Sequence, residues 1–342
     1  MINAKEKKRV MLTGASGFVG HHMVEHFLKE TVWDIIIVDK LSYSSNGFDR
    51  IRDINAYDDD RVSLFTSDLT KPFAEGLKQE IGDVDVIINL ASGSHVDNSI
   101  TDPTEFINNN VQLMQNVLEY CREIKPELLI QFSTDEVYGS APEGTNYAEG
   151  DRFNPGNPYS ASKAMQECLC YAYSNTYKVP IMVTNTMNVL RERQHPEKYL
   201  PLIINKVRTG ETLSIHADPT CTKAGSRFYI HARNVADGVL HLLTHSDETL
   251  DNIDASKGKF HIVGEKELDN LELAKIVASN MDGELKYELV DFHGARPGHD
   301  LRYAMSGEKM KSIGWEPPVN IEDSIKGIVE WSLDEDNVRW LG

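Results

Sequence analysis

The chain has few cysteines, no long apolar run and fewer positive than negative charges. Its four cysteines, Cys121, Cys168, Cys170 and Cys221, lack the second cysteine pair and the histidine spacing of a zinc site. We therefore expect reduced structural thiols and no metal. The sequence also lacks the run of ~20 apolar residues that a membrane-spanning helix needs, so we predict no membrane segment.

Negative charges dominate the composition. Asp and Glu number 53 against 35 for Lys and Arg, which gives a formal net charge of −18. A chain this acidic repels a phosphate backbone, so we exclude a nucleic-acid partner. A small anionic substrate would need a local basic pocket. The short charged start, Met1 to Arg9, contains no apolar signal segment, and we expect a cytoplasmic protein.

The first half of the chain alternates apolar strand-like runs with amphipathic helical patterns. The strands are predicted at Arg9–Thr13, Trp33–Asp39, Val62–Thr66, Val84–Leu90, Leu128–Ser133 and Ile181–Asn185. The helices are predicted near Phe18–Lys29, Phe73–Glu80, Thr104–Ile124 and Tyr159–Tyr177. This alternation predicts an α/β fold with a doubly wound parallel sheet, that is, a Rossmann-like domain.

The pattern changes after Asn185. We expect a strand at Arg227–Ile230, a helix near Asn234–Leu243 and a strand at Lys259–Val263 to rejoin the sheet. The stretch from Leu268 onward has helical patterns at Leu271–Met281 and Ile321–Leu333, which predict most of a smaller mixed α/β lobe. We therefore divide the chain into a large domain, 1–186 plus 226–264, and a smaller lobe, 187–225 plus 265–342.

Three regularly spaced glycines follow the first predicted strand, in Thr13-Gly14-Ala15-Ser16-Gly17-Phe18-Val19-Gly20. Glycine is required where a turn is tight, where backbone approaches a phosphate and where a helix packs closely on a strand. The start of the next helix offers free N–H groups to a pyrophosphate. Such a triplet can be a structural turn, but its place between strand and helix predicts a dinucleotide-binding site.

Asp39 ends the second predicted strand, 19 residues after Gly20. A carboxylate there accepts hydrogen bonds from the adenosine ribose hydroxyls and repels a 2′-phosphate. The sequence therefore favours NAD over NADP, although the neighbouring Lys40 argues the other way. Asp68 follows the third strand and Ala91-Ser92 follow the fourth, where strand ends meet a cofactor in this architecture.

Tyr159 and Lys163 stand four residues apart in a predicted helix, so their side chains share one helix face. Such a pair is common by chance, but here it follows a predicted dinucleotide fold. An ammonium near a phenol lowers the pKa of the phenol from ~10. The resulting phenolate can take a hydroxyl proton while hydride leaves for the nicotinamide.

Thr134, Asp135 and Glu136 follow the fifth predicted strand, in Ser133-Thr134-Asp135-Glu136-Val137-Tyr138-Gly139. A solvated turn is the alternative interpretation. Strand ends in such a sheet face the ligand crevice, however, and two close carboxylates help to keep one of them protonated. Oxidising sugar C4 to a ketone acidifies the C5 proton, so one carboxylate can remove that proton while the other protonates the leaving C6 hydroxyl. The pair predicts a sugar dehydratase, because a simple 4-epimerase does not need it.

With these motifs the sequence resembles the extended short-chain dehydrogenase/reductase family, and within it the nucleotide-sugar 4,6-dehydratases. The resemblance covers nearly the whole chain, and its most specific part is the Thr-Asp-Glu triplet at 134–136. It also includes Asp39–Tyr43, Ser94–Ile100, Pro196–Lys198, Arg296–Asp300 and Ile313–Pro317.

The resemblance implies a role for each catalytic residue. Asp135 is the acid, Glu136 the C5 base and Tyr159 the base for the C4 hydroxyl. Lys163 is the partner of Tyr159 and of the nicotinamide ribose, and Thr134 holds the C4 oxygen. The hydride taken from C4 returns to C6, so NAD is a bound cofactor and the product is a nucleotide 4-keto-6-deoxy sugar. The expected substrate is dTDP-glucose, with UDP-glucose as the main competitor.

The resemblance also implies the residues of both binding sites. For NAD they are Gly14, Ser16, Gly17, Phe18, Val19, Gly20, Asp39, Lys40, Ser42, Asp68, Leu69, Leu90, Ala91, Ser92, Ser133, Tyr159 and Lys163. For the nucleotide sugar they are Ser94, Thr134, Asn188, Lys198, Tyr199, Arg227, Asn270, Arg296, His299 and Tyr303. Arg227 and Arg296 suit a diphosphate, because a guanidinium can bind two oxygens at once. His95 and His299 are expected to be structural hydrogen-bonding residues rather than catalysts.

The chain departs from the family pattern in three places. Asn188-Val189-Leu190-Arg191-Glu192 stands where the family has Asn-Asn-Tyr-Gly-Pro. The segment Ala217–Gly225 is longer than usual, and Ala295 replaces an acidic residue. We expect these changes to lie on the substrate side, where they affect the nucleotide or the sugar and leave the dehydratase chemistry intact.

Two other functions stay open on the sequence alone. One is another NAD-dependent nucleotide-sugar enzyme, a 4-epimerase or a glucuronate decarboxylase. The other is a non-catalytic NAD-binding sensor or scaffold, which would predict eroded catalytic positions. A homodimer is expected through the helices near Thr104–Ile124 and Tyr159–Tyr177, whose apolar faces can equally be buried inside the domain.

Overall fold

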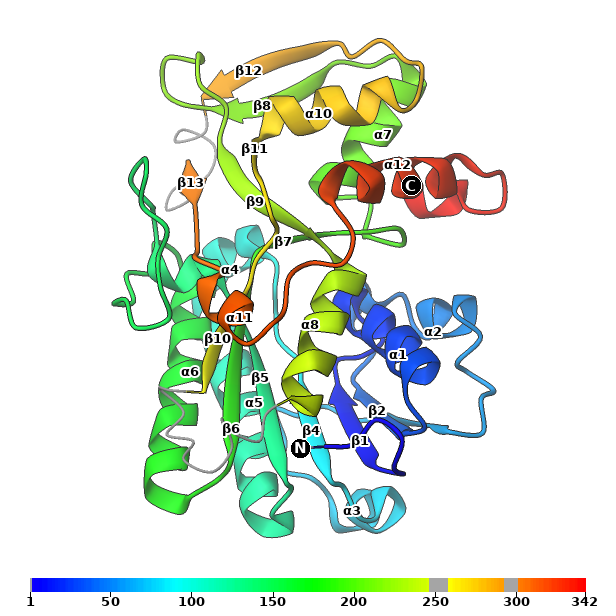
Figure 1. Cartoon of the computed structure of the whole chain (residues 1–342), viewed down its shortest axis with the longest axis vertical. Helices are drawn as coiled ribbons and strands as arrows, with labels where there is room; N and C mark the ends of the chain where they lie inside the picture. Colours follow the sequence, from blue (N-terminus) through cyan, green and yellow to red (C-terminus); the bar gives the residue numbers. More distant parts are fainter. Residues whose placement is uncertain (1, 246–257, 292–300) are drawn as a thin grey trace.

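The computed structural model of the chain describes residues 2–245, 258–291 and 301–342. In this part of the chain, seven parallel strands form a central sheet in the order β10-β6-β5-β4-β1-β2-β3 (Figure 1). The strands are β1 (Arg9–Thr13), β2 (Asp34–Asp39), β3 (Val62–Thr66), β4 (Val86–Asn89), β5 (Leu128–Thr134), β6 (Ile181–Thr186) and β10 (Lys259–Ile262). The predicted doubly wound parallel sheet is confirmed.

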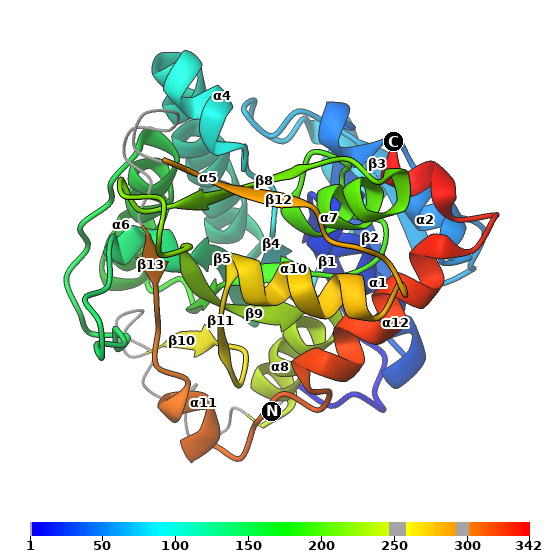
Figure 2. The same cartoon turned by 90° about the horizontal axis from the view of Figure 1, so that it is seen from above.

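Helices cover both faces of this sheet (Figures 1 and 2). One face is covered by α1 (Phe18–Glu30) and α8 (Ala232–Thr244). The other face is covered by α3 (Glu75–Ile81), α5 (Pro103–Ile124) and α6 (Pro158–Tyr177). The sequence order of strands and helices therefore leads to the layered arrangement that parallel strands need, since each crossover helix lies on a sheet face.

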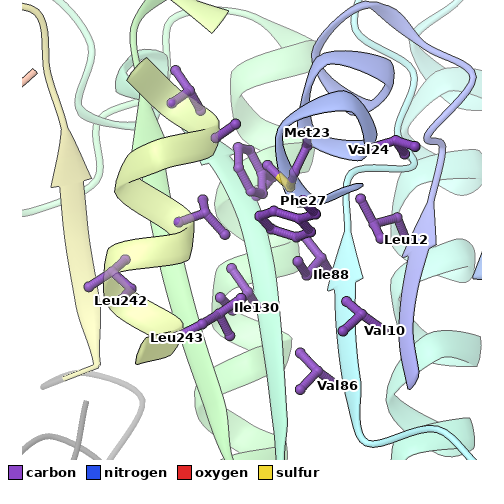
Figure 3. Packing of buried hydrophobic residues seen from close by; sticks show 14 of the residues in the cluster. Val10, Leu12, Met23, Val24, Phe27, Val86, Ile88, Ile130, Leu242 and Leu243 are labelled. Carbon is purple, nitrogen blue, oxygen red and sulfur yellow. The ribbon is translucent and has the colours of Figure 1, made fainter. Parts of the chain in front are cut away.

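Alternate strand residues supply the two cores. Leu12 of β1 lies in the core under α1 and α8, whereas its neighbour Met11 lies in the core under α5, because successive strand side chains point to opposite faces. Figure 3 shows the first core, where Phe27 of α1 lies by Ile88 of β4 and Leu243 of α8 lies by Ile130 of β5. Burial on both faces explains why these strands read as continuous apolar runs.

The start of α6 is set by its own sequence. The Asn157 side chain caps the helix by accepting from the Ser160 N–H, and the Ser160 hydroxyl accepts from the Asn157 N–H. Pro158 occupies the first helical position. This capping box satisfies N–H groups that a helix start otherwise leaves free. The helix ends where Lys178 adopts a left-handed conformation. Because the cap fixes where α6 begins, it also fixes where Tyr159 and Lys163 lie relative to the sheet.

The smaller lobe contains two further sheets. Its strands are β7 (Asn188–Leu190), β8 (Leu213–Ala217), β9 (Ser226–His231), β11 (Glu267–Asp269), β12 (Tyr287–Asp291) and β13 (Arg302–Tyr303). One sheet has the order β11-β9-β13 with β7 also paired to β9, and β12 pairs with β8. The lobe's core is shared with α7 (Tyr199–Thr209), α10 (Asn270–Ser279) and α12 (Ile321–Leu333). The predicted smaller mixed lobe is confirmed, and Figure 1 places it at one end of the central sheet.

Short helical turns complete the described chain. They are η1 (Tyr43–Ser45), α2 (Asp49–Asp53), α4 (Val96–Thr101), η2 (Asp135–Tyr138), α11 (Glu308–Ser312) and η3 (Val338–Leu341). Each is too short for the periodicity that reveals a helix in a sequence, so none was predicted. Among the residues described, no helix has the length and apolarity that crossing a membrane requires.

One strand prediction is wrong. The segment Arg227–Ile230 does not rejoin the central sheet, because β9 pairs with β7, β11 and β13 in the smaller lobe. The Lys259–Val263 prediction is correct, since β10 lies beside β6 at the edge of the central sheet. A short apolar run does not reveal which sheet it joins, and the partners of β9 come from distant segments. The division into 1–186 plus 226–264 and the remainder stays a prediction.

Candidate active site

A cleft of about 250 Å³ opens at the carboxyl ends of β1, β2 and β4, where the strand order reverses. In doubly wound sheets this switch point is where ligands bind. Gly17 forms the N-cap of α1 without any side-chain hydrogen bond, so the first N–H groups of the helix face the cleft unshielded by a cap. The arrangement suits a pyrophosphate.

Two positions in the glycine triplet require glycine in this structure. Gly14 has a φ of +69°, and a Cβ there would lie 2.7 Å from the Ala91 Cα. A Cβ on Gly20 would lie 2.4 Å from the Ala15 Cα. The first glycine therefore permits the turn after β1, and the second lets α1 pack closely on that turn.

Asp39 lies at the end of β2 with its carboxylate bonded to two backbone N–H groups. Oδ2 accepts from Ser16 at 3.0 Å and Oδ1 accepts from Leu41 at 2.8 Å. Burial raises the pKa of Asp39, while these two bonds lower it. Asp39 still lines the cleft, so its remaining lone pairs can accept from ribose hydroxyls as predicted for NAD.

Most residues predicted to contact NAD line this cleft. They are Gly14, Gly17, Phe18, Val19, Gly20, Asp39, Lys40, Ser42, Leu69, Leu90, Ala91 and Ser92. Five predicted residues do not line it: Ser16, Asp68, Ser133, Tyr159 and Lys163. Asp68 is exposed and bonds to the Thr70 N–H, and Ser67 takes its place in the lining. Ser16 and Ser133 are buried, and Ser16 acts through its backbone bond to Asp39.

The cleft also contains residues that the sequence did not reveal. Arg50 of α2 lines it with a side chain that is almost completely buried, and its guanidinium donates to the Arg193 and Ser45 carbonyls. Gln194 and His195, which follow β7 in the sequence, line the same cleft. No spacing motif marks these residues. The only sequence signal for Arg50 was that an arginine follows a strand predicted to meet the cofactor, in a chain that is strongly acidic.

The segment around Arg191 to Arg193 lies elsewhere than predicted. The His22 ring of α1 bonds to the Glu192 carbonyl, and Arg193 pairs with Asp53 of α2 at 3.1 Å. Arg191 and Glu192 form a buried ion pair beside them. This segment therefore packs against the cofactor side of the molecule, and the expectation that its changes face the substrate is wrong. Its charges are accommodated because they pair with one another in the interior.

Four predicted catalytic residues come together at the carboxyl end of β5. The Thr134 hydroxyl donates to Asp135 Oδ1 at 2.8 Å and also forms a hydrogen bond with the Tyr159 side chain. Glu136 Oε2 accepts from Asn157 Nδ2 at 3.1 Å. Because Asn157 caps α6, the strand end and the helix start are tied together. The carboxylates are adjacent to the phenol, and neither is a solvated turn residue.

Asp135 has the environment of a proton donor. Its side chain is 4% exposed, and Oδ2 has no hydrogen-bond partner among the described residues. Burial raises the pKa of Asp135 to about 6, against the lowering effects of the Thr134 bond and the Arg227 charge. The main cause is burial, not the neighbouring carboxylate that we expected. An acid with this pKa carries a proton at neutral pH far more often than an exposed Asp.

The Lys163 ammonium bonds to groups other than Tyr159. Its Nζ donates to the Phe132 carbonyl and to Gln166 Oε1, both at 2.7 Å, and burial lowers its pKa to about 8. Burial, followed by the charge of Glu136, raises the pKa of Tyr159. The expectation that Lys163 lowers the pKa of Tyr159 is therefore wrong for this arrangement. Helix spacing places both residues on one face, but the packing against β5 decides which oxygens the ammonium reaches.

A second cleft, of about 520 Å³, adjoins the first. Both clefts are lined by Ser94, His95, Glu197 and Lys198, so they share a wall. Of the predicted substrate residues, those that line the second cleft are Ser94, Asn188, Lys198, Tyr199, Arg227 and Asn270. Glu136 lines it as well, whereas Thr134 does not. Glu136 therefore faces a cleft that is continuous with the dinucleotide cleft.

The shared wall is organised around Glu197. Its carboxylate lies 3.5 Å from the His95 ring, 3.6 Å from the His195 ring and 3.7 Å from Lys198 Nζ. His95 also accepts from the Asn98 N–H and so caps α4. This agrees with the expectation that His95 bonds structurally.

Arg227 is a cationic residue in the wall of the second cleft. Its side chain is nearly buried in the wall of the second cleft, and Nη1 has no hydrogen-bond partner among the described residues. The guanidinium lies 5.5 Å from the centre of the Tyr303 ring. Tyr303 itself is buried and does not line the cleft, so it supports Arg227 and does not face the substrate cleft as predicted. Arg296 and His299 lie outside the described residues.

Metal ligation receives no support in the described ranges. They contain no group of three or more His, Cys, Asp or Glu residues that could hold a metal ion. Cys121 and Cys170 are buried and Cys168 and Cys221 are exposed, all as free thiols.

Comparisons with known proteins agree with this geometry. The model of the "NAD dependent epimerase/dehydratase family" matches residues 10–255. Over 96% of this chain and 99% of its own length, the low-salt glycan biosynthesis protein Agl12 of Haloferax volcanii is 31% identical. A dTDP-glucose 4,6-dehydratase of Neisseria gonorrhoeae is 31% identical over 97% of this chain and 98% of its own.

A solved structure extends the likeness to three dimensions. The crystal structure of DesIV, a dTDP-glucose 4,6-dehydratase from Streptomyces venezuelae, contains bound NAD and TYD. It superposes with a TM-score of 0.83 at 30% identity and covers 97% of this chain and 98% of its own. The glycine turn, Asp39 and the crevice between β1 and β4 fit the dinucleotide that this family uses. The chain belongs to the NAD dependent epimerase/dehydratase family, among the extended short-chain dehydrogenases/reductases that act on nucleotide sugars.

Proposed function

We propose that the protein is an NAD-dependent nucleotide-sugar 4,6-dehydratase. The observation that carries the proposal is the cluster at the end of β5, where Asp135 and Glu136 adjoin Tyr159 and Glu136 faces the second cleft. Dehydration needs a base and an acid besides the group that serves oxidation, and this cluster supplies all three. The sensor or scaffold alternative predicts that these positions are lost, and all of them are present.

Bound NAD supplies the acceptor of the C4 hydride and the donor that returns it to C6. Tyr159 takes the proton of the C4 hydroxyl, and Thr134 holds the same oxygen. Glu136 removes the C5 proton, which the C4 ketone has acidified, and returns a proton to C5 when the hydride adds to C6. Asp135 delivers a proton to the C6 hydroxyl, which then leaves as water. The raised pKa of Asp135 suits it to this role.

The expected substrate is dTDP-glucose, with UDP-glucose as the competitor. Support comes from the relatives that carry the dTDP-glucose 4,6-dehydratase name and from the anion-binding setting of Arg227 and Lys198. The direct test is an assay of dTDP-, UDP-, GDP- and CDP-glucose with mass detection of water loss. A 4-keto-6-deoxy product supports the proposal. An epimer, or release of carbon dioxide from a glucuronate substrate, would instead identify a 4-epimerase or a decarboxylase.

Arg227 provides a test of substrate binding. The change Arg227→Met keeps most of the side-chain length but removes the charge-assisted bonds to a diphosphate, which contribute about 1.5–3 kcal/mol. We expect KM for the nucleotide sugar to rise at least ~10-fold, with a smaller change in kcat. The control is Arg208→Met, at an exposed arginine of α7. An unchanged KM in the Arg227 variant would place the diphosphate elsewhere.

We also propose that two copies associate through α5 and α6. These helices carry an open apolar groove lined by Val111, Ala164, Met165 and Leu169 among others, and Met165 is 43% exposed. Contiguous exposed apolar surface of this kind marks association sites. The cytoplasmic location stays a prediction from the sequence.

The change Met165→Glu is expected to convert the dimer to a monomer, because it places a charge in an apolar interface. Light scattering after size exclusion measures the mass directly. Val319→Glu is the matched control, at an exposed apolar residue outside the groove. A wild-type protein that is already monomeric, or a Met165 variant that remains dimeric, contradicts this interface.

A further inference from the structure

A buried ion pair lies behind the catalytic cluster. Glu167 Oε2 of α6 and Lys259 Nζ of β10 are 2.9 Å apart, and the two side chains are 0% and 1% exposed. The Lys259 ammonium also lies 4.5 Å from the ring centres of Tyr138 and Phe153. Neither Glu167 nor Lys259 lines either cleft. Direct binding of cofactor or substrate therefore does not account for the pair.

Asn185 of β6 connects this ion pair to the catalytic strand end. Its Nδ2 donates to the Thr134 carbonyl at 2.9 Å and to Glu167 Oε1 at 2.8 Å. Thr134 in turn bonds to Asp135 and Tyr159 through its hydroxyl. A single buried amide group thus links Glu167 to the last residue of β5 and, through it, to the reacting groups.

Glu167 also lies on the catalytic face of α6. Tyr159, Lys163 and Glu167 follow one another at four-residue spacing, so their side chains line one side of the helix. The negative charge of Glu167 favours the protonated form of Lys163, against the burial that lowers the pKa of that lysine. Lys259 balances the charge of Glu167. The interior behind the site therefore contains charges of alternating sign.

Stability alone does not explain a fully buried ion pair. Withdrawing two charges from water is unfavourable, and apolar replacements of similar volume are often neutral or stabilising. Aromatic rings already surround the Lys259 ammonium, so an apolar side chain would have neighbours to pack against. The geometry and charge that the pair imposes on its neighbours are the better explanation.

We propose that Glu167 is a positioning residue for C4 oxidation. Through Asn185 it holds the carboxyl end of β5, with Thr134, at a set distance from α6. Its charge favours the ammonium form of Lys163, and Lys259 is the counter-ion that permits a buried carboxylate. The inference rests on the proposed function only in that Tyr159 accepts the C4 hydroxyl proton and Lys163 holds the nicotinamide ribose for C4 oxidation, a step that a dehydratase shares with a 4-epimerase.

Titratable groups face Glu167 from each element packed against it. They are Lys163, Cys168, Cys170 and Tyr171 on α6, Tyr138 on η2 and Lys259 on β10. Burial raises the pKa of these tyrosines and cysteines, so they stay neutral near neutral pH. Lys163 and Lys259 are thus the groups whose charge responds to Glu167.

The test is the double variant Glu167→Gln/Lys259→Met, which removes both charges and leaves no isolated charge inside. We expect kcat to fall at least ~10-fold, as a small misplacement of reacting groups does. KM for the nucleotide sugar that the wild type turns over should stay within ~2-fold, and bound NAD should be unchanged. Without the Glu167 charge the pKa of Lys163 falls further, so the loss of activity at alkaline pH should begin at a lower pH.

Two further variants complete the experiment. Glu322→Gln/Lys266→Met removes an ion pair of 2.8 Å whose side chains are about half exposed, and it should keep the wild-type kcat and pH profile. Asn185→Ser removes the link to Thr134 but no charge, so it should lower kcat without moving the alkaline limb. If the double variant does not fold, the kcat of Asn185→Ser still tests whether the link from Glu167 to Thr134 positions the reacting groups.

The proposal has definite contradictory results. A wild-type kcat and pH profile in the Glu167/Lys259 variant would overturn it, as would a loss confined to KM or to NAD content. A wild-type kcat in Asn185→Ser would overturn the link through β5. Because each variant is read against the wild type's own product, an epimerised product would refute the dehydratase proposal and still leave this test valid.

Discussion

Changing Glu136 to Gln is expected to lower turnover at least ~100-fold while the cofactor stays bound, which is the scale of a lost general base. Glu136 faces the second cleft, and its carboxylate is held by the Asn157 amide at the start of α6. Glutamine keeps the size and an accepting oxygen, but it cannot take the C5 proton. C4 oxidation does not use Glu136, so the variant should still oxidise C4.

Three measurements check this expectation. Mass detection should show little dehydrated product, and the C5 hydrogen should no longer exchange with deuterated water. In a single turnover the absorbance of reduced nicotinamide should accumulate. The control is Glu143→Gln, at a glutamate whose side chain is 88% exposed and which should behave as wild type. Near-normal turnover of the Glu136 variant would assign proton removal to another residue.

Changing Tyr159 to Phe should also lower turnover by ~100-fold or more, but at the earlier step. The variant loses only the hydroxyl, which bonds to Thr134 in this structure. Without that group nothing at this position accepts the C4 hydroxyl proton, so C4 is not oxidised. Glu136 and Asp135 then have no acidified proton on which to act.

The two variants are distinguished by the cofactor signal. With Tyr159→Phe, no absorbance of reduced nicotinamide should appear in a single turnover, whereas Glu136→Gln should accumulate it. The matched control is Tyr287→Phe, at an exposed tyrosine of β12 that should leave turnover unchanged. Accumulation of reduced nicotinamide in the Tyr159 variant would show that another group accepts the C4 proton.

Local signals in the chain were enough to place the central sheet and its helices. Runs such as Leu128 to Ser133 are apolar throughout because both faces of β5 are buried, and α6 begins at a cap that its own residues form. The prediction that β9 joins the central sheet was wrong because its actual partners, β7, β11 and β13, lie far apart in sequence. A pairing of that kind leaves no trace in a short apolar run.

The residues of the candidate site likewise divide into those that sequence spacing could place and those that it could not. Residues within one turn or one strand end, such as Asp39 and Glu136, could be placed from spacing alone, because parallel strands bring their carboxyl ends to a common edge. Arg50 could not, since it reaches the cofactor cleft through a bond to the Arg193 carbonyl, 143 positions away. The cofactor-side location of the segment at 191–193 arises from the same long-range contacts.

The order of the chain alone predicts the central sheet and the candidate reacting groups, since hydrophobic period, capping and glycine spacing are local properties. The protonation states and partners of those groups are settled only by folding. Burial, which depends on every element packed around a side chain, raises the pKa of Asp135, and the packing of α6 against β5 places the Lys163 ammonium at the Phe132 carbonyl. Desolvation is a property of the assembled interior, and no residue pattern carries it.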